Sequence, residues 1–320
     1  MSQPAPKAPK VRDPRNGLRT SATLATVFTF LGHRYFGFEQ STVAVAVCLI
    51  TGYACAILFE TIDAAANDRV PGYRGGGPKK VVDFLLSAHM TSITMSFLLY
   101  ANDRLAVLAL AVALALGSKY FFRVQVGGRT RHFMNPSNFG LVIVLLCYQW
   151  TSSIPWGMTT DLHGWQDWAL PIIVTMLGFR LNLLFTKRLP LIAAWLIGFL
   201  VQAYVRHLGF GSPLDAEIAP LTNVAMVLFT FYMITDPQTS PAEPRRQVAF
   251  GLGIAATYGV LMCLHITYTI FYAVVIVCSI RGVWLAAESV LEARAKAPAR
   301  VPTQTASPVP ALGTIVGPGL

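Results

Sequence analysis

The chain has 320 residues, of which 54% are hydrophobic and only 12% are charged, with a mean hydropathy of +0.53. Soluble domains carry about 25% charged residues, so this composition excludes an ordinary soluble enzyme and a disordered protein. The net charge of +10 does not indicate a nucleic-acid binder, because the basic residues lie in short clusters between apolar runs. That arrangement is typical of a multi-pass membrane protein.

Ten segments approach the length of about 20 apolar residues, or about 17 at the short end, that a helix needs to span a bilayer. We therefore predict an all-α polytopic membrane protein. The predicted spans are 20–32, 40–62, 81–100, 104–119, 138–152, 167–182, 189–206, 217–235, 247–265 and 267–285. Before this domain lies a basic segment, 1–19, that lacks a cleaved-signal pattern. After it, 286–320 is predicted to be a flexible cytoplasmic tail.

Lysine and arginine residues are concentrated in every second loop of this arrangement. If the N-terminus is cytoplasmic, the opposite side holds only Arg34, Arg104 and Arg206, which leaves 22 of the 25 basic residues in cytoplasmic segments. The positive-inside rule then predicts that both termini lie on the cytoplasmic side of a bacterial inner membrane. Ten spans divide into two five-helix halves of opposite orientation, which is the logic of an inverted repeat.

The third predicted span, 81–100, carries polar residues on two faces, with Asp83 on one and His89 on the other. A helix of this kind is expected in the interior of the bundle. An ionisable side chain within the membrane is a functional candidate by default. The alternative is a neutral, structural His89 that is hydrogen-bonded to a neighbouring serine or threonine.

The loop over 117–140 combines a glycine pair, Gly127–Gly128, with basic residues and a helix start. The basic residues nearest that start are Arg129, Arg131 and His132. Asn135 is placed to cap the next helix, whose first turn would contain Pro136. A helix N-terminus beside arginines can bind a phosphate. The alternative is a basic loop that only sets membrane orientation.

A second polar stretch closes the predicted eighth span. Taken together, GG-x-x-R-H-x-x-NP at 127–136 and F-x-M-I-T-D-P-x-T-S-P at 231–241 resemble the NqrB/RnfD family of membrane electron-transport subunits. The closest resemblance is to its UnbU-like branch, which is associated with enediyne biosynthesis. The resemblance implies two inverted five-helix repeats over 20–285, a flavin near both motifs and a protein partner in a redox complex. The site positions that it carries over are Arg129, Arg131, His132, Asn135, Pro136, Thr235, Asp236, Pro237 and Thr239.

Larger members of that family attach FMN covalently to the threonine of an [ST]-G-A-T motif. This sequence has no such motif, and Thr159 and Thr160 in the matching outer loop lack the Gly-Ala context. We therefore expect a noncovalent flavin or a quinone, membrane lipid and a protein as partners, and no metal site. Two alternatives stay open: a transporter or channel without a redox cofactor, and a haem b protein with His89 and His265 as axial ligands.

In the second motif, Asp236 has the wrong charge to bind an anion. We expect it to cap backbone amides or to pair with Arg129 or Arg131. Both motifs fall on the cytoplasmic side of the predicted topology. The sequence therefore predicts that the two loops border one cavity on that face.

Overall fold

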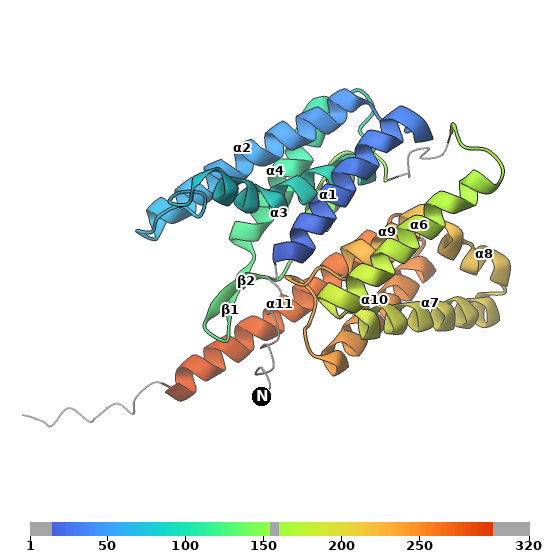
Figure 1. The fold of residues 1–320 in the computed structure, drawn as a ribbon. Coiled ribbons are helices and arrows are strands. Elements are labelled where there is room, and N and C mark those ends of the chain that lie inside the picture. The colour runs from blue at the N-terminus through green and yellow to red at the C-terminus, as the bar shows by residue number, and fades with distance from the viewer. Residues whose placement is uncertain (1–14, 154–159, 297–320) are drawn as a thin grey trace, which may run out of the picture.

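The computed structural model describes residues 15–153 and 160–296, and most of them are helical (Figure 1). Six helices in this part of the chain are long and apolar enough to cross a membrane. They are Thr42–Ala66, Gly77–Leu98, Trp168–Thr186, Leu189–Phe210, Pro244–Cys263 and Thr269–Glu292. The predicted class of all-α membrane protein is confirmed at this level, whereas the count of ten spans stays a prediction.

The first half of the chain forms five helices, of which α1 to α4 gather in the upper part of Figure 1. They are α1 (Arg15–Leu31), α2 (Thr42–Ala66), α3 (Gly77–Leu98), α4 (Leu105–Phe121) and α5 (Pro136–Cys147). Helix α3 packs against α1, α2, α4 and α5, and its Ser92 and Ser96 are buried. This is the interior position predicted for a helix with polar residues on two faces.

The second half begins with α6 (Trp165–Leu181) and α7 (Leu189–Phe210), and it ends with α10 (Pro244–Cys263) and α11 (Thr269–Lys296). The predicted eighth span is broken into short pieces between α7 and α10. These pieces are α8 (Leu214–Ile218), η3 (Ala219–Thr222), α9 (Val224–Leu228) and the π-helical turn η4 (Phe229–Met233). The chain bends by 65° at the break between Thr222 and Val224.

The two halves begin with the same local structure. Helix α1 runs into a π-helical turn, η1 (Gly32–Phe36), and α6 runs into another, η2 (Asn182–Thr186). Each turn ends at a residue in the left-handed conformation, Gly37 with φ 69° and Lys187 with φ 55°. The next long helix then packs against the fourth helix of the same half, α2 against α4 and α7 against α10. In the second half this count takes the broken pieces from α8 to η4 as one helix.

Close helix packing in both halves depends on glycine. A Cβ at Gly140 of α5 would lie 2.3 Å from the carbonyl oxygen of Ala111 in α4. A Cβ at Gly251 of α10 would lie 2.7 Å from the carbonyl oxygen of Leu191 in α7. Small residues let helix backbones approach closely where lipid supplies no hydrophobic driving force.

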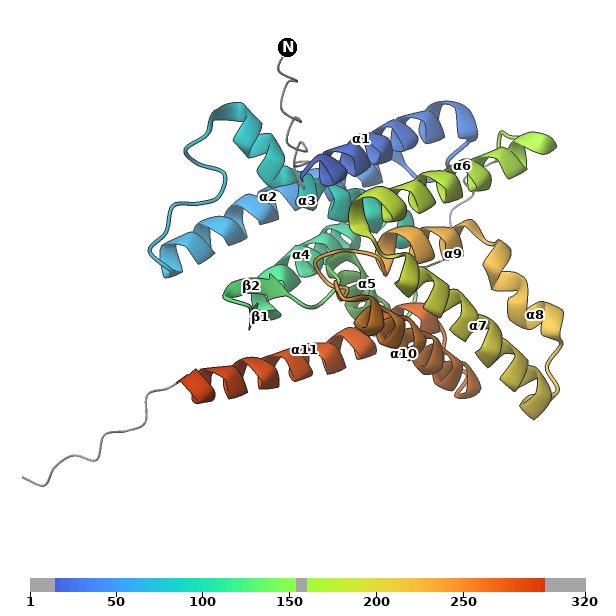
Figure 2. The same cartoon turned by 60° about the horizontal axis from the view of Figure 1, so that its bottom comes forward.

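The loop predicted over 117–140 contains a short β-hairpin, β1 (Arg123–Val126) paired with β2 (Arg129–His132). Gly127 and Gly128 form its turn with φ values of 56° and 75°. A two-residue turn with positive φ at both positions strongly favours glycine, so the glycine pair shapes the hairpin. Figure 2 shows the hairpin beside α11, and the two are in contact.

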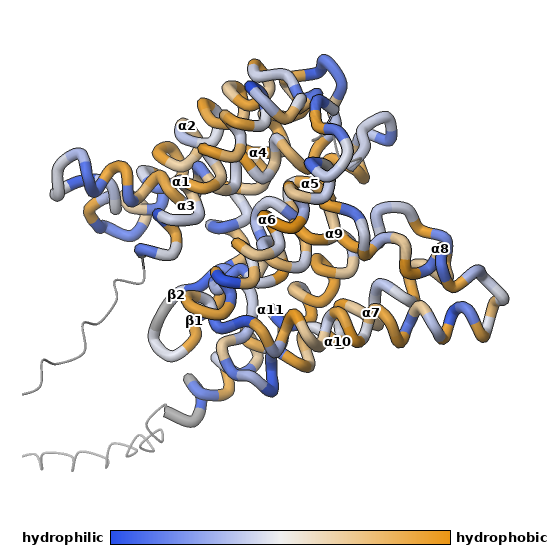
Figure 3. The backbone as a smooth tube through the Cα atoms, turned by 45° about the vertical axis from the view of Figure 1, so that its right-hand side comes forward, coloured by the Kyte–Doolittle hydropathy of each residue, from blue (hydrophilic) through white to orange (hydrophobic). Residues whose placement is uncertain are grey.

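Loops that the charge pattern places on the same side meet in space. On the predicted outer side, Tyr100 pairs with Ser152 through the backbone, and the Tyr268 hydroxyl donates to the carbonyl oxygen of Thr151 at 3.4 Å. At the other end, α4, α11 and the hairpin come together. Figure 3 shows apolar residues along the helix bodies and hydrophilic residues gathered in the connections.

Candidate functional site

Asn135 connects the two sequence motifs directly. Its buried side chain caps α5, because Oδ1 accepts hydrogen bonds from the Asn138 backbone N–H and the Ser137 hydroxyl, both at 3.1 Å. Its Nδ2 donates to the carbonyl oxygen of Met233 at 3.1 Å. Met233 lies two residues before Thr235 in the second motif. The predicted helix cap therefore also joins the first half of the chain to the second.

Asp236 organises the turn that follows. Its Oδ1 accepts from the backbone N–H of Gln238 at 3.1 Å, and its Oδ2 accepts from the Thr239 hydroxyl at 3.2 Å. Its carbonyl oxygen accepts from the backbone N–H of Ser240 at 2.9 Å. Asp236 makes no ion pair with Arg131 within the described residues. The capping role expected for Asp236 is therefore the one that the geometry shows.

Two arginines from other parts of the second half donate hydrogen bonds to this turn. Nε of the buried Arg188 donates to the Ser240 hydroxyl at 2.8 Å, and Nη1 of Arg281 in α11 donates to the carbonyl oxygen of Thr239 at 2.9 Å. Burial lowers the pKa of Arg188, and the nearby Asp236 carboxylate acts in the opposite direction. Thr235 is buried. These two hydrogen bonds therefore tie the turn to the start of α7 and to the middle of α11.

The hairpin separates the basic residues that the sequence grouped together. Arg123 pairs with His132 and Gln125 with Thr130 in its register. Side chains alternate between the faces of a strand, so Thr130 and His132 share one face and Arg131 lies on the other. Arg131 is exposed. The backbone of Arg129 pairs with Val126 beside the turn.

A cleft of about 490 Å³ opens on the face that carries Thr130 and His132. It lies between the C-terminal ends of α2 and α4, the connection that follows α2, and the hairpin. Its lining residues are Asp63, Asn67, Arg69, Lys119, Tyr120, Arg123, Thr130 and His132. Three basic side chains thus face one carboxylate and a histidine.

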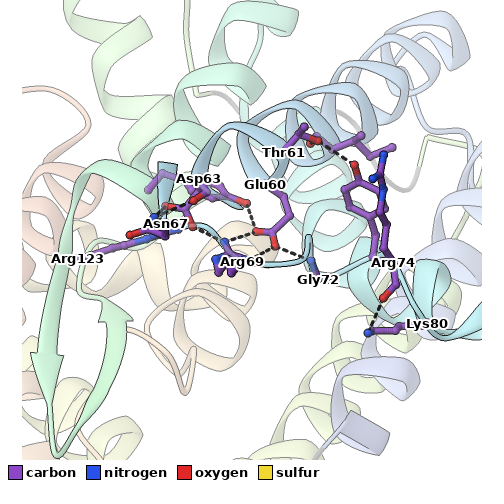
Figure 4. Close-up of polar contacts among 12 residues, drawn as sticks. Glu60, Thr61, Asp63, Asn67, Arg69, Gly72, Arg74, Lys80 and Arg123 are labelled. Atoms are coloured by element: carbon purple, nitrogen blue, oxygen red, sulfur yellow. Dashed lines mark hydrogen bonds and ion pairs between the residues drawn. The ribbon is translucent and has the colours of Figure 1, made fainter. Parts of the chain in front are cut away.

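An ion-pair network forms one wall of this cleft (Figure 4). Arg69 pairs with Glu60 at 2.5 Å and also with Asp63. Asp63 in turn pairs with Nη1 of Arg123 at 2.8 Å. The hydrogen bonds that Arg69 donates to Glu60 and then to Asp63 raise the pKa of Arg69, so its charge is fixed. The network joins α2 to the hairpin.

Lys119 is held differently from the two arginines. Its ammonium donates to the Ser87 hydroxyl at 2.9 Å and to the Thr91 hydroxyl at 3.2 Å on α3. Within the described residues it forms no ion pair with a carboxylate. The sequence alone suggested no role for Lys119. The signal in the sequence was the face of the third predicted span that carries Ser87 and Thr91, because these hydroxyls accept hydrogen bonds from Lys119.

His132 links the cleft to the turn at Asp236. Burial lowers the pKa of His132 from an ordinary 6.5 to about 4. The Asp236 carboxylate opposes this shift, whereas Lys119 and Arg123 add to it. His132 is therefore neutral at pH 7. The Asp236 carboxylate therefore acts on His132 across the two motifs, although Asp236 is not among the residues that line the cleft. That the two loops border one cavity stays a prediction.

His89 lies apart from this group and bridges three helices. Its Nε2 lies 2.8 Å from the Thr26 hydroxyl of α1, and its Nδ1 lies 2.6 Å from the Tyr53 hydroxyl of α2. Because Thr26 donates its own proton to the carbonyl oxygen of Ala22, Nε2–H is the donor to Thr26 and Nδ1 accepts from Tyr53.

Both ring nitrogens of His89 are thus engaged, whereas a haem ligand must leave one of them to the iron. The other histidine of the haem hypothesis, His265, is exposed in the connection between α10 and α11. Neither histidine is presented as an axial ligand in this arrangement.

Comparisons with known proteins were made on the whole sequence. No protein-family model matches the chain, and no curated protein matches it. The resemblance to the NqrB/RnfD family therefore stays a prediction that depends on the two motifs.

Asn138, three residues after Asn135, is a polar residue that sequence reasoning missed. It is fully buried, and its Nδ2 donates to the carbonyl oxygen of Phe271 in α11 at 2.9 Å. Its Oδ1 has no hydrogen-bond partner within the described residues. A buried amide oxygen without a donor is costly, so Asn138 is a candidate to accept a hydrogen bond from a ligand.

The predicted outer loop contains Thr159 and Thr160, the two hydroxyls considered above as sites of covalent flavin attachment. Thr159 lies outside the described residues. The Thr160 hydroxyl donates to the carbonyl oxygen of Gly37, and in this way it ties the loop to the end of η1. Trp165 and Trp168 at the start of α6 are exposed, as residues of an interfacial aromatic belt are.

Proposed function

We propose that this chain is a membrane subunit of an electron-transfer system, built as two inverted five-helix halves in a bacterial inner membrane with both termini cytoplasmic. The two π-helical turns that follow α1 and α6, and the matching packing of α2 on α4 and α7 on α10, support the repeat. The motif resemblance to the NqrB/RnfD family supports the redox role and a protein partner.

In this proposal the cofactor is a noncovalent flavin held where the halves meet. The observation that carries it is the junction of the two motifs through the hydrogen bond from Asn135 to Met233. Beside that junction, Oδ1 of Asn138 is a buried acceptor without a partner. A flavin ring offers an N–H donor that suits this oxygen, whereas a quinone ring offers only acceptors, so the donor set favours flavin over quinone.

When bound, the flavin would supply the electron-accepting and electron-donating chemistry. The chain would supply position and electrostatics. Asn135 and Asn138 would orient the ring between α5 and the second half. The hydrogen-bonded turn at Asp236 would position the neighbouring backbone. The buried Arg188 and the partly buried Arg281 would favour an additional negative charge nearby.

The visible spectrum of the purified full-length protein in detergent tests this proposal. A bound flavin gives absorption in the blue. Because it is noncovalent, denaturation should release the flavin into the supernatant, and the protein band on a denaturing gel should not be fluorescent. Asn138→Leu should lower the flavin content. Ser92→Ala, which removes another buried oxygen without a partner in the described part of the chain, should retain it. A protein without bound flavin contradicts the proposal.

A second candidate function is solute transport without a redox cofactor. It is favoured by the break in the eighth predicted span, where the helical segments meet at 65°. Many transporters bind their substrates at discontinuous helices of this kind. A colourless protein that moves a solute in vesicles would favour this candidate, and a Soret band would favour haem.

A further inference from the structure

We propose that the cleft between α2, α4 and the hairpin binds a phosphate monoester on the predicted cytoplasmic face, with Lys119 as its principal cation. This site is separate from the junction at Asn135 and Asn138, and the inference does not rest on the proposed redox function. Thr130 and His132 of its lining belong to the first motif, whereas Lys119, Arg69 and Arg123 lie outside both motifs.

The charge balance of the lining points to an anion. Arg69 and Arg123 are both paired with Asp63, and Arg69 is also paired with Glu60. Within the described residues Lys119 forms no ion pair: its ammonium donates to neutral oxygens of Ser87 and Thr91, and the Asp236 carboxylate acts on it without pairing. A partly buried cation without a paired carboxylate is costly, and an anionic ligand would offset that cost.

The free donors of the cleft come from three elements. The Thr130 hydroxyl accepts from Nε2 of Gln125 at 2.7 Å, so its own proton is available to a ligand. Arg123 uses Nη1 for Asp63 and Nε for the carbonyl oxygen of Lys119, which leaves Nη2 available. Together with the positive charge of the Lys119 ammonium, these donors suit a group with several terminal oxygens, and a phosphate monoester has three.

The volume indicates more than an inorganic ion. Sites for small organic ligands enclose about 300–1,000 Å³, and this cleft encloses about 490 Å³. The Tyr120 ring supplies an aromatic surface, and the Arg123 guanidinium lies 4.4 Å from the centre of that ring. The phosphate could therefore carry either a soluble organic group or the glycerol of a lipid, since the cleft lies at the ends of two apolar helices.

Calorimetric titration of the full-length protein in phosphatidylcholine nanodiscs tests the site. The ligands are adenosine monophosphate and adenosine, which differ only in the phosphate, and inorganic phosphate. Adenosine monophosphate and inorganic phosphate should bind and adenosine should not. Lys119→Gln keeps a donor for Ser87 and Thr91 but removes the charge, and it should weaken phosphate binding by about 10-fold or more.

Two controls sharpen this result. Lys79→Gln removes the same charge from an exposed position at the start of α3, on the same predicted side of the membrane, and it should leave binding unchanged. Lys119→Arg keeps the charge and should retain most of the affinity. The affinity of the parent should also fall with added salt more steeply than that of Lys119→Gln.

A second set of nanodiscs that contains phosphatidic acid distinguishes the source of the phosphate. If this lipid blocks adenosine monophosphate in the parent, a lipid headgroup occupies the cleft. If it does not, the ligand is a soluble ester. The inference is wrong if no phosphate compound binds, or if Lys119→Gln binds like the parent. The flavin spectrum is read separately, so failure of either proposal leaves the other intact.

Discussion

Replacing Asn135 should destabilise the protein in two separable steps. Asn135→Ala removes both the cap on α5 and the hydrogen bond to Met233 in the second half. Asn135→Ser keeps a good capping group, but the shorter side chain does not reach Met233. Comparison of the two variants therefore separates a local helix cap from a contact between the halves.

The structure gives the size of each step. Loss of a cap costs about 1 kcal/mol, within a range of about 0.5–2. The carbonyl oxygen of Met233 keeps a second donor, the backbone N–H of Asp236 at 3.4 Å, so it is not left unsatisfied. Loss of the hydrogen bond should then cost about 1 kcal/mol. We expect a total of about 2 kcal/mol for Asn135→Ala and about half of that for Asn135→Ser.

Thermal unfolding in detergent measures both steps. A thiol-reactive fluorophore reports unfolding, because Cys48 and Cys278 are buried in the folded protein. The midpoint should fall from the parent to Asn135→Ser and fall again by a similar amount to Asn135→Ala. If Asn135→Ser unfolds like the parent, the contact between the halves contributes nothing. If it unfolds like Asn135→Ala, the capping argument is wrong.

Three further predictions concern topology, His89 and pH. Reporter fusions after positions 75, 128 and 240 should be cytoplasmic and those after 160 and 212 external; one fusion on the wrong side would require different spans. His89→Leu should impair activity or cofactor retention without preventing insertion, and Tyr53→Phe, which removes one of its two partners, should have a smaller effect; unchanged function in both indicates a packing role. The pKa of His132 is lowered by burial to about 4 in the folded state, so the unfolded chain binds the proton first. The stability that depends on neutral His132 should be complete above about pH 6.5 and lost as the pH falls through about 4. His132→Gln should flatten this part of the unfolding profile, and an unaltered profile would contradict the assignment.

Local features of the sequence predicted much of the fold. Apolar runs and the sorting of basic residues indicate the membrane class because transfer of each segment into lipid depends mainly on its own composition. Asn135 before Pro136 predicted a capped helix start, and the structure has the cap at that position. Asp236 was expected to bind backbone amides, and it does. Each of these features is decided by residues within a few positions of one another.

Contacts between distant segments decided the rest. The basic residues near position 130 looked like one group, but strand alternation turns His132 toward the cleft and Arg131 away from it. Lys119 donates a hydrogen bond to Ser87 of α3, and Asn135 donates one to Met233, about a hundred residues further along the chain. A side chain contacts whatever the packing of helices brings within about 3 Å. That packing depends on the whole bundle, so the cleft and the junction of the halves became visible only in the tertiary structure.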